Sequence, residues 1–233
     1  MVMQARGPGR IPDKLSLRQQ AYDALRRGIL DGLYPPGALL SENQLAEELE
    51  ISRTPIREAL RDLATAGLLR ILPQRGIVVS EPTIEDAVEV YQLREQLECF
   101  AARLAAERLG QADLAGFTRD HRHALEHLAA GHDRLAYDHS ILMHARIIDM
   151  ARNSRLTQVM TLLSDQTHRF GLLTLRNGRA SPAIHEHGEI IAAIGARDAE
   201  LAAARMLAHL RADRDMVLAL ILPAGISVRP LAS

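Results

Sequence analysis

Residues 41–79 read SENQLAEELEISRTPIREALRDLATAGLLRILPQRGIVV, and this stretch decides the fold of the first part of the chain. Ser41 and Ser52 are of a type that caps helices, and apolar residues follow each of them at three- and four-residue steps. We therefore predict a short helix after Ser41 and a second helix from Ser52 to Gly67, since glycine commonly ends a helix. Residues 68–80 contain two β-rich runs split by a Pro-Gln-Arg-Gly turn, which predicts a hairpin.

The residues before this stretch extend the pattern. Residues 15–33 have the apolar spacing of a helix, which Gly32 and a following Pro-Pro-Gly run should end. Leu39 and Leu40 are too few for more than a fragment of strand. Helix, short helix, turn, helix and hairpin is the order of a winged helix-turn-helix, whose second paired helix presents its N-terminal residues to the DNA major groove. Arginine there can pair with guanine, and hydroxyl groups can bond to phosphates or bases.

The same stretch resembles the winged-helix regulators of the GntR type over about residues 15–80, and SRTPIREAL is among its most specific parts. The resemblance implies contacts to operator DNA from the helix N-terminus and the hairpin tip. The implied residues are Ser41, Ser52, Arg53, Thr54, Arg57, Arg75 and Gly76. Asn43 stands where the family often has Arg or Lys, so we expect a weaker contact there. Glu50 stands where the family usually has glycine, and a positive φ there would cost about 1 kcal/mol.

Beyond residue 81 the sequence predicts helices only, because no alternation of apolar and polar residues is visible. The expected helices are 83–109, 111–130, 132–151, 154–176, 183–196 and 198–221. The predicted fold is mainly α, with an N-terminal winged helix-turn-helix followed by an all-α bundle of about six helices. The predicted division is a flexible arm (1–13), a DNA-binding domain (14–80), a helical domain for effector binding and dimerisation (81–222) and a tail (223–233).

Composition narrows the class of protein. The chain has 233 residues, of which 47% are hydrophobic and 24% charged, as in ordinary globular proteins. Its apolar runs are too short to cross a bilayer, its N-terminus lacks the apolar stretch of a secretory signal, and Cys99 is its only cysteine. We therefore expect a cytoplasmic protein with no membrane partner. Residues 1–80 carry a net charge of +2 and the remainder −3, and all ten histidines follow residue 120, which indicates two segments with different roles.

The second half resembles the FCD domain, the helical effector domain of the FadR-like branch of these regulators. The matching stretches within about residues 83–222 are VYQLREQLECFAARLAAERL, MHARIIDMARNSRL and HGEIIAAIGARDAELAAARMLAHL. The resemblance implies that His144, His187 and His209 hold a divalent metal such as Zn²⁺ or Ni²⁺. Ser140 stands where the family usually has Asp, so we expect a weaker site, one completed by water, or none. The alternative is that the three histidines only form hydrogen bonds in a polar core.

Arg94 is the candidate for binding an effector. It lies in LREQLE, where the family pattern also has Arg, and a guanidinium can hold the carboxylate of a small organic acid through two hydrogen bonds. The alternative is a plain pair with Glu98, four residues further along the same helix.

These features predict a transcriptional regulator, with repression as the commoner mode of the family, that binds a pseudo-palindromic operator in double-stranded DNA as a homodimer. A small carboxylate would control its affinity. Two alternatives stay open, a constitutive DNA-binding dimer and a histidine-metal hydrolase. The hydrolase is disfavoured, because Asp138, Asp149 and Glu186 have no catalytic spacing such as HExxH. We expect no enzyme.

Overall fold

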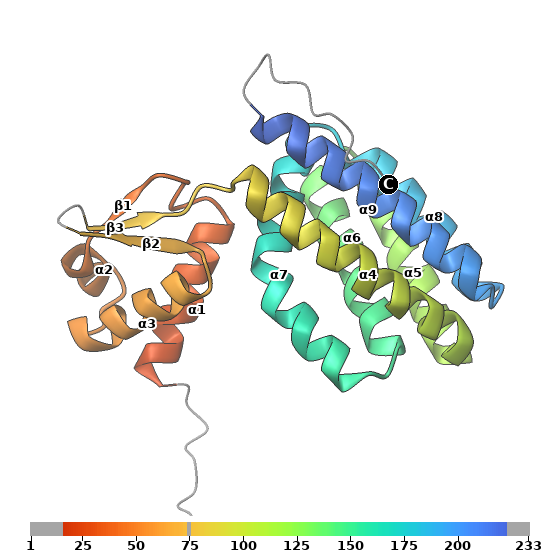
Figure 1. Cartoon of the computed structure of the whole chain (residues 1–233), viewed down its shortest axis with the longest axis horizontal. Helices are drawn as coiled ribbons and strands as arrows, with labels where there is room; N and C mark the ends of the chain where they lie inside the picture. Colours follow the sequence, from red (N-terminus) through yellow and green to blue (C-terminus); the bar gives the residue numbers. More distant parts are fainter. Residues whose placement is uncertain (1–15, 74–75, 223–233) are drawn as a thin grey trace, which may run out of the picture. The chain divides into compact units, whose positions relative to one another are not determined.

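The structure is a computed structural model that describes residues 16–73 and 76–222 (Figure 1). The chain forms two compact units, Met1–Glu81 and Pro82–Ser233. Three predicted features lie outside the described residues, namely the arm at 1–13, the tail at 223–233 and Arg75.

The first unit has the predicted winged helix-turn-helix fold. Its elements are α1 (Leu17–Leu30), β1 (Leu39–Leu40), α2 (Glu42–Glu48), α3 (Arg53–Thr65), β2 (Leu69–Leu72) and β3 (Gly76–Val79). The strands are antiparallel in the order β1-β3-β2, so the two-residue β1 becomes the third strand of the wing sheet, with Leu40 opposite Ile77. The helix ends where Gly32 was predicted to stop it, because Gly32 takes a positive φ of 83° and the last helical residue is Leu30.

Burial of one helical face sets the orientation of α3. Ile56, Leu60 and Leu63 are fully buried, and they pack with Leu25 of α1 and Val79 of β3 in the core of this unit. The polar residues between them are consequently turned outward.

Glu50 ends α2 with the strained backbone that the sequence predicts. Its φ is 53°, and the N–H groups of Glu50 and Ile51 donate to the carbonyls of Glu47 (3.3 Å) and Ala46 (3.1 Å). This pair of bonds closes a helix end in the left-handed conformation that usually selects glycine. The sharp turn between α2 and α3 therefore contains a non-glycine residue in a backbone conformation that its Cβ atom disfavours.

The second unit is an all-α bundle. Its described residues form α4 (Ile84–Arg108), α5 (Gln111–Ala129), α6 (Asp133–Met150), α7 (Ser154–Leu175), α8 (Ala180–Gly195) and α9 (Ala199–Ile221), which confirms the six predicted helices. Local chemistry sets their starts, since Thr83 and Asp86 form a capping box and Asn153 and Asp198 cap α7 and α9. Only α8 differs clearly, beginning three residues before the predicted 183. Its proline is tolerated because N–H groups in the first turn have no partner within the helix.

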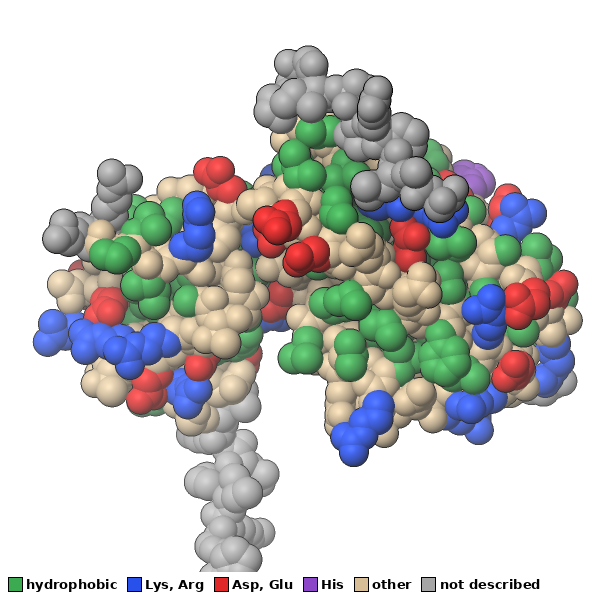
Figure 2. Space-filling view, viewed as in Figure 1, with side chains coloured by type: hydrophobic (Ala, Val, Ile, Leu, Met, Phe, Trp, Pro, Cys, Tyr) green, Lys and Arg blue, Asp and Glu red, His purple; other side chains and the backbone are tan. Residues whose placement is uncertain are grey.

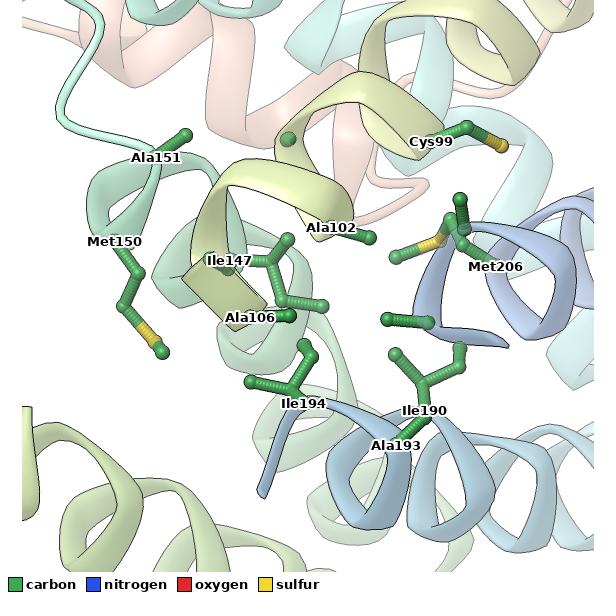
Figure 3. Close-up of a cluster of buried hydrophobic side chains, with 14 of the residues drawn as sticks. Cys99, Ala102, Ala106, Ile147, Met150, Ala151, Ile190, Ala193, Ile194 and Met206 are labelled. Atoms are coloured by element: carbon green, nitrogen blue, oxygen red, sulfur yellow. The ribbon is translucent and has the colours of Figure 1, made fainter. Parts of the chain in front are cut away.

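Small side chains bring the helices close together around the bundle core. Ala102 of α4 lies beside Met206 of α9, and Ala106 of α4 lies beside Ile194 of α8, with Ile190 of α8 nearby (Figure 3). All five side chains are buried. Among the described helices, none combines the length and the apolar character that crossing a bilayer would need.

Candidate functional site

The first candidate surface is the N-terminal end of α3. Ser52 is the N-cap in an extended conformation, and its side chain makes no capping hydrogen bond in the described part of the chain. Arg53 and Thr54 follow it and are exposed, while the apolar face of α3 is buried. Figure 2 shows a row of basic side chains over this helix. The end of α3 therefore presents arginine, hydroxyl and backbone N–H groups outward, as a helix that enters a DNA groove must.

Arg57 is exposed too, but it is already paired. Its Nε and terminal nitrogen donate to both carboxylate oxygens of Glu42 on α2, at 2.7–3.1 Å. The same bonds hold the pKa of the Glu42 carboxyl below its ordinary value. The pairing was not predicted, because nothing in the sequence marks the start of α2 and the second turn of α3 as neighbours. Arg57 must exchange or share this partner to contact DNA.

The other predicted DNA contacts are spread around α3. Asn43 is exposed on α2, and Ser41 is the N-cap of α2 with no capping bond from its side chain in the described structure. Gly76 begins β3 with φ of 96°, and a Cβ there would lie 3.3 Å from Leu39 Cδ1. The backbone conformation therefore requires glycine at this point of the wing, whether or not Gly76 contacts DNA. These DNA contacts stay predictions.

The second candidate site is a buried histidine cluster in the helical unit. His144 of α6, His187 of α8 and His209 of α9 each offer a ligand atom, and these atoms lie within 4.8 Å of one another. The Nε2 atoms of His187 and His209 are 3.1 Å apart. Two nitrogens bound to one Zn²⁺ at about 2.0–2.1 Å with tetrahedral angles would lie about 3.4 Å apart. The His187–His209 pair is therefore close to the spacing in a metal site, and His144 lies near enough to complete a three-histidine cluster.

The outer nitrogen of each ring has its own partner. His144 Nδ1 lies 2.5 Å from a carboxylate oxygen of Glu98, His209 Nδ1 lies 2.8 Å from Glu186, and His187 Nδ1 lies 3.0 Å from the Ser140 hydroxyl. Such outer partners orient metal-binding histidines and leave the Nε2 atoms for the ion. Ser140, which stands at the family's usual Asp position, thus faces the outer edge of a ring.

Burial favours the neutral form, which metals bind, in two of the three rings. Desolvation lowers the pKa of His187 well below its ordinary value, and the neighbouring His209 and His144 act in the same direction. The pKa of His144 is also lowered by burial, against the opposing effect of Glu98. A neutral imidazole has a lone pair to donate, whereas a protonated one does not.

Arg94 forms the intrahelical pair with Glu98 that was the alternative to effector binding. Its Nε donates to Glu98 at 2.6 Å, and its guanidinium carbon lies 5.0 Å from the ring centroid of Tyr91. Although Arg94 is 3% exposed, it lines two neighbouring cavities. Burial opposes the Glu98 charge, but Arg94 and His144 together hold the pKa of that carboxyl far below its ordinary value. The intrahelical pair therefore exists, and it leaves the terminal nitrogens of Arg94 for another partner.

The two cavities differ in size and lining. The smaller measures about 60 Å³ and is lined by the three histidines with Arg94 and others. The larger measures about 250 Å³, lies between α4, α6 and α7, and combines apolar side chains with hydroxyl groups. Arg94 and His144 line both. A ligand in the larger cavity would therefore reach the charged centre through these two residues.

A partly buried ion-pair network beside the histidines was not predicted from the sequence. Arg179 donates to Asp213 at 2.8 Å and to Glu186 at 2.5–2.9 Å. Against the cost of burial, His209 and Arg179 lower the pKa of the Glu186 carboxyl. The only sequence signal was the four-residue step from His209 to Asp213, which places both on one face of α9.

Comparisons with known proteins match the two parts of the chain to two different families. Residues 17–79 match the family described as "Bacterial regulatory proteins, gntR family", and residues 89–212 match the FCD domain. The chain is 30% identical over 200 residues to a "Probable D-xylose utilization operon transcriptional repressor" of Paenarthrobacter nicotinovorans, covering 85% of this chain and 88% of that protein. It is 28% identical over 200 residues to an "Uncharacterized HTH-type transcriptional regulator YdhC" of Bacillus subtilis, covering 83% and 88%.

The fold comparison extends over both units. The structure of Escherichia coli McbR/YncC matches with a TM-score of 0.74 at 23% identity, covering 88% of this chain and 98% of that one. At this level of identity the match shows a shared fold.

Proposed function

Because the chain belongs to the GntR family of bacterial regulatory proteins and carries an FCD domain, we propose that it is a ligand-responsive transcriptional repressor. It binds operator DNA in the cytoplasm through α3 and the wing, and a small organic acid in the helical unit controls its affinity. The observation that carries the proposal is the buried polar centre, where Arg94 and three histidines line neighbouring cavities. A relative in Paenarthrobacter nicotinovorans is named as a probable repressor, which supports the direction of control.

The chemistry of the centre favours an anionic ligand. Arg94 is fixed at its Nε by Glu98 and at its face by Tyr91, so its terminal nitrogens are preorganised to bind a carboxylate. The larger cavity of about 250 Å³ suits a small molecule whose body contacts apolar and hydroxyl groups. We infer that the carboxylate of the effector lies near Arg94 and His144.

The three histidines fit a divalent metal such as Zn²⁺ or Ni²⁺. Their ligand atoms converge, and each outer nitrogen has a partner. A bound ion would supply a Lewis acid that accepts an oxygen of the ligand. His144, His187 and His209 would hold it, while Arg94 would orient the ligand from the other side.

The surface of α4 supports a homodimer. Leu93, Leu97, Phe100 and Leu104 recur at steps of four, three and four residues, which is the spacing of a helix-packing seam. Leu93 and Phe100 are 48% and 43% exposed. Apolar side chains gather on this face of the helical unit (Figure 2). Two-fold pairing of α4 helices would bury the seam and present two winged helices to two half-sites.

Ligand control then follows from geometry. Half-sites in DNA have a fixed spacing, so an effector that favours one arrangement of the paired units over another changes operator affinity. The alternative of a constitutive DNA-binding dimer leaves the centre without a role, although buried charged groups are expensive to maintain. The hydrolase alternative fails on family membership, because these proteins are transcriptional regulators and not enzymes.

The test measures operator affinity and thermal stability with a panel of small mono- and dicarboxylates, using DNA from upstream of the chain's own gene. We expect at least one acid to raise the melting temperature and to change the affinity for DNA. Arg94→Lys keeps a charge beside Glu98 but loses the planar fork, so it should lose the response. Arg211→Lys, an exposed change on α9, is the matched control. Specific DNA binding that responds to no acid, in wild type and Arg94→Lys alike, would support the constitutive dimer.

A further inference from the structure

The charge of the histidine centre is incomplete. Histidine side chains contribute no negative charge, whereas a carboxylate close by stabilises a divalent cation in a buried site. Ser140 cannot supply it, because a serine hydroxyl is neutral and this one lies 3.0 Å from the outer Nδ1 of His187. If the protein itself supplies an anionic ligand, that ligand comes from a residue other than Ser140.

Three carboxylates lie beside the histidine rings, and they are not equivalent. Glu98 and Glu186 contact Nδ1 atoms, on the outer edges of His144 and His209. Asp213 contacts the inner edge, with its Oδ2 3.4 Å from His209 Nε2. Among the described residues, it is the one carboxylate recorded beside an Nε2 atom of the cluster. Asp213 also lines the small cavity with the three histidines.

Arg179 holds Asp213 in this position. It donates from Nε to Asp213 Oδ1 at 2.8 Å, so Oδ2 is left on the histidine side. The same guanidinium binds Glu186, which in turn contacts His209. The Arg179 side chain is 8% exposed and those of Asp213 and Glu186 are 15% and 32% exposed, so these ion pairs are partly shielded from water.

We propose that Asp213 Oδ2 is the anionic ligand of the metal centre, in place of a carboxylate at position 140. The proposal rests on the metal site of the proposed function and adds a ligand to it. His209 and Asp213 lie one turn apart on α9 and so bring an imidazole and a carboxylate to the same point. Arg179 acts as a positioning residue that orients the carboxylate without touching the ion.

The decisive experiment places a spectroscopic label at each competing position. Co²⁺ is the probe, because a thiolate bound to Co²⁺ gives an intense charge-transfer band in the near ultraviolet that imidazole and carboxylate ligands lack. We expect Asp213→Cys to show this band and Ser140→Cys to lack it. Wild type sets the baseline, because its single cysteine, Cys99, is buried and burial raises the pKa of its thiol to about 11.

A second variant keeps the test valid if Asp213→Cys does not fold. Asp213→Asn retains an oxygen for Arg179 but removes the charge, and we expect its Zn²⁺ affinity to fall more than about 100-fold, beyond the effect of losing an outer partner. Asp215→Asn is the matched control, since Asp215 is an exposed neighbour on α9.

The outcomes separate this inference from the proposed function. A wild type with no Co²⁺ spectrum overturns the metal site and Asp213 together. A wild type that binds Co²⁺, combined with Zn²⁺ affinity unchanged in Asp213→Asn, overturns Asp213 alone. A thiolate band in Ser140→Cys but not in folded Asp213→Cys also overturns it, because position 140 would then face the ion.

Discussion

The end of α3 and the histidine centre use charged and polar groups in opposite ways. Arg53 and Thr54 stand exposed on one short segment, where water solvates them until a partner arrives. His187 and His209 are 3% and 1% exposed, and each ring nitrogen contacts a group from another helix or turn. The exposed groups at the end of α3 exchange water for a binding partner, whereas the buried histidines are already bonded to neighbouring side chains. The two regions should therefore respond very differently to substitution, metal removal and pH.

The largest effect is expected where the buried centre loses a ligand. His187→Gln should lower the affinity for Zn²⁺ or Ni²⁺ by more than about 100-fold, since losing even an outer partner of a metal ligand costs about 10- to 100-fold. His185→Gln removes an exposed imidazole two residues away and should leave the affinity unchanged. Metal content by elemental analysis and affinity by competition with a chelator measure both. Equal affinities in the two variants would contradict the role of the cluster.

Loss of an exposed arginine should have a smaller effect, seen only with DNA. Arg53→Ala should weaken operator binding by about 10- to 100-fold, the range for one base contact by arginine, with no change in stability. Fluorescence anisotropy at several salt concentrations measures it, since a base contact and a phosphate contact differ in salt dependence. Arg61→Ala, an exposed change two turns along α3, should matter much less. An equal loss in both variants would mean that α3 offers only a diffuse positive charge.

The difference between the two regions also explains what the sequence could predict. The winged helix was predictable because its signals are local, with caps, apolar spacing and the hairpin turn all lying within residues 41–80. The three histidines were identified only through family resemblance, because they come from three helices and no spacing links them. Arg179 and Asp213 were missed for the same reason, since 34 residues separate them. The pair of Glu42 with Arg57 shows that this limit applies to exposed contacts as well.

A dependence of stability on pH should mark the buried centre. The folded protein holds His187 and His144 with lowered pKa values, so the unfolded chain binds protons that the folded chain does not. In metal-free protein the free energy of unfolding should therefore fall as the pH drops below about 6.5, by up to about 1.4 kcal/mol per pH unit for each histidine. Urea unfolding between about pH 5 and about pH 7.5 measures the slope. His187→Gln should flatten it and His185→Gln should not, and equal slopes would show that burial of His187 is not its source.

The smallest effect concerns the turn that aims α3. Glu50 adopts φ of 53°, which a residue with a Cβ atom resists and glycine does not. Glu50→Gly should raise the stability of the protein by less than about 1 kcal/mol, because relief of the strain is partly offset by the greater freedom of glycine in the unfolded chain. Glu50→Ala removes the same carboxylate but keeps the Cβ, so it should bring no such gain, and chemical denaturation can compare the two. If Glu50→Ala stabilises the protein as much as Glu50→Gly, the gain comes from removing a negative charge beside the end of α2 and not from the backbone.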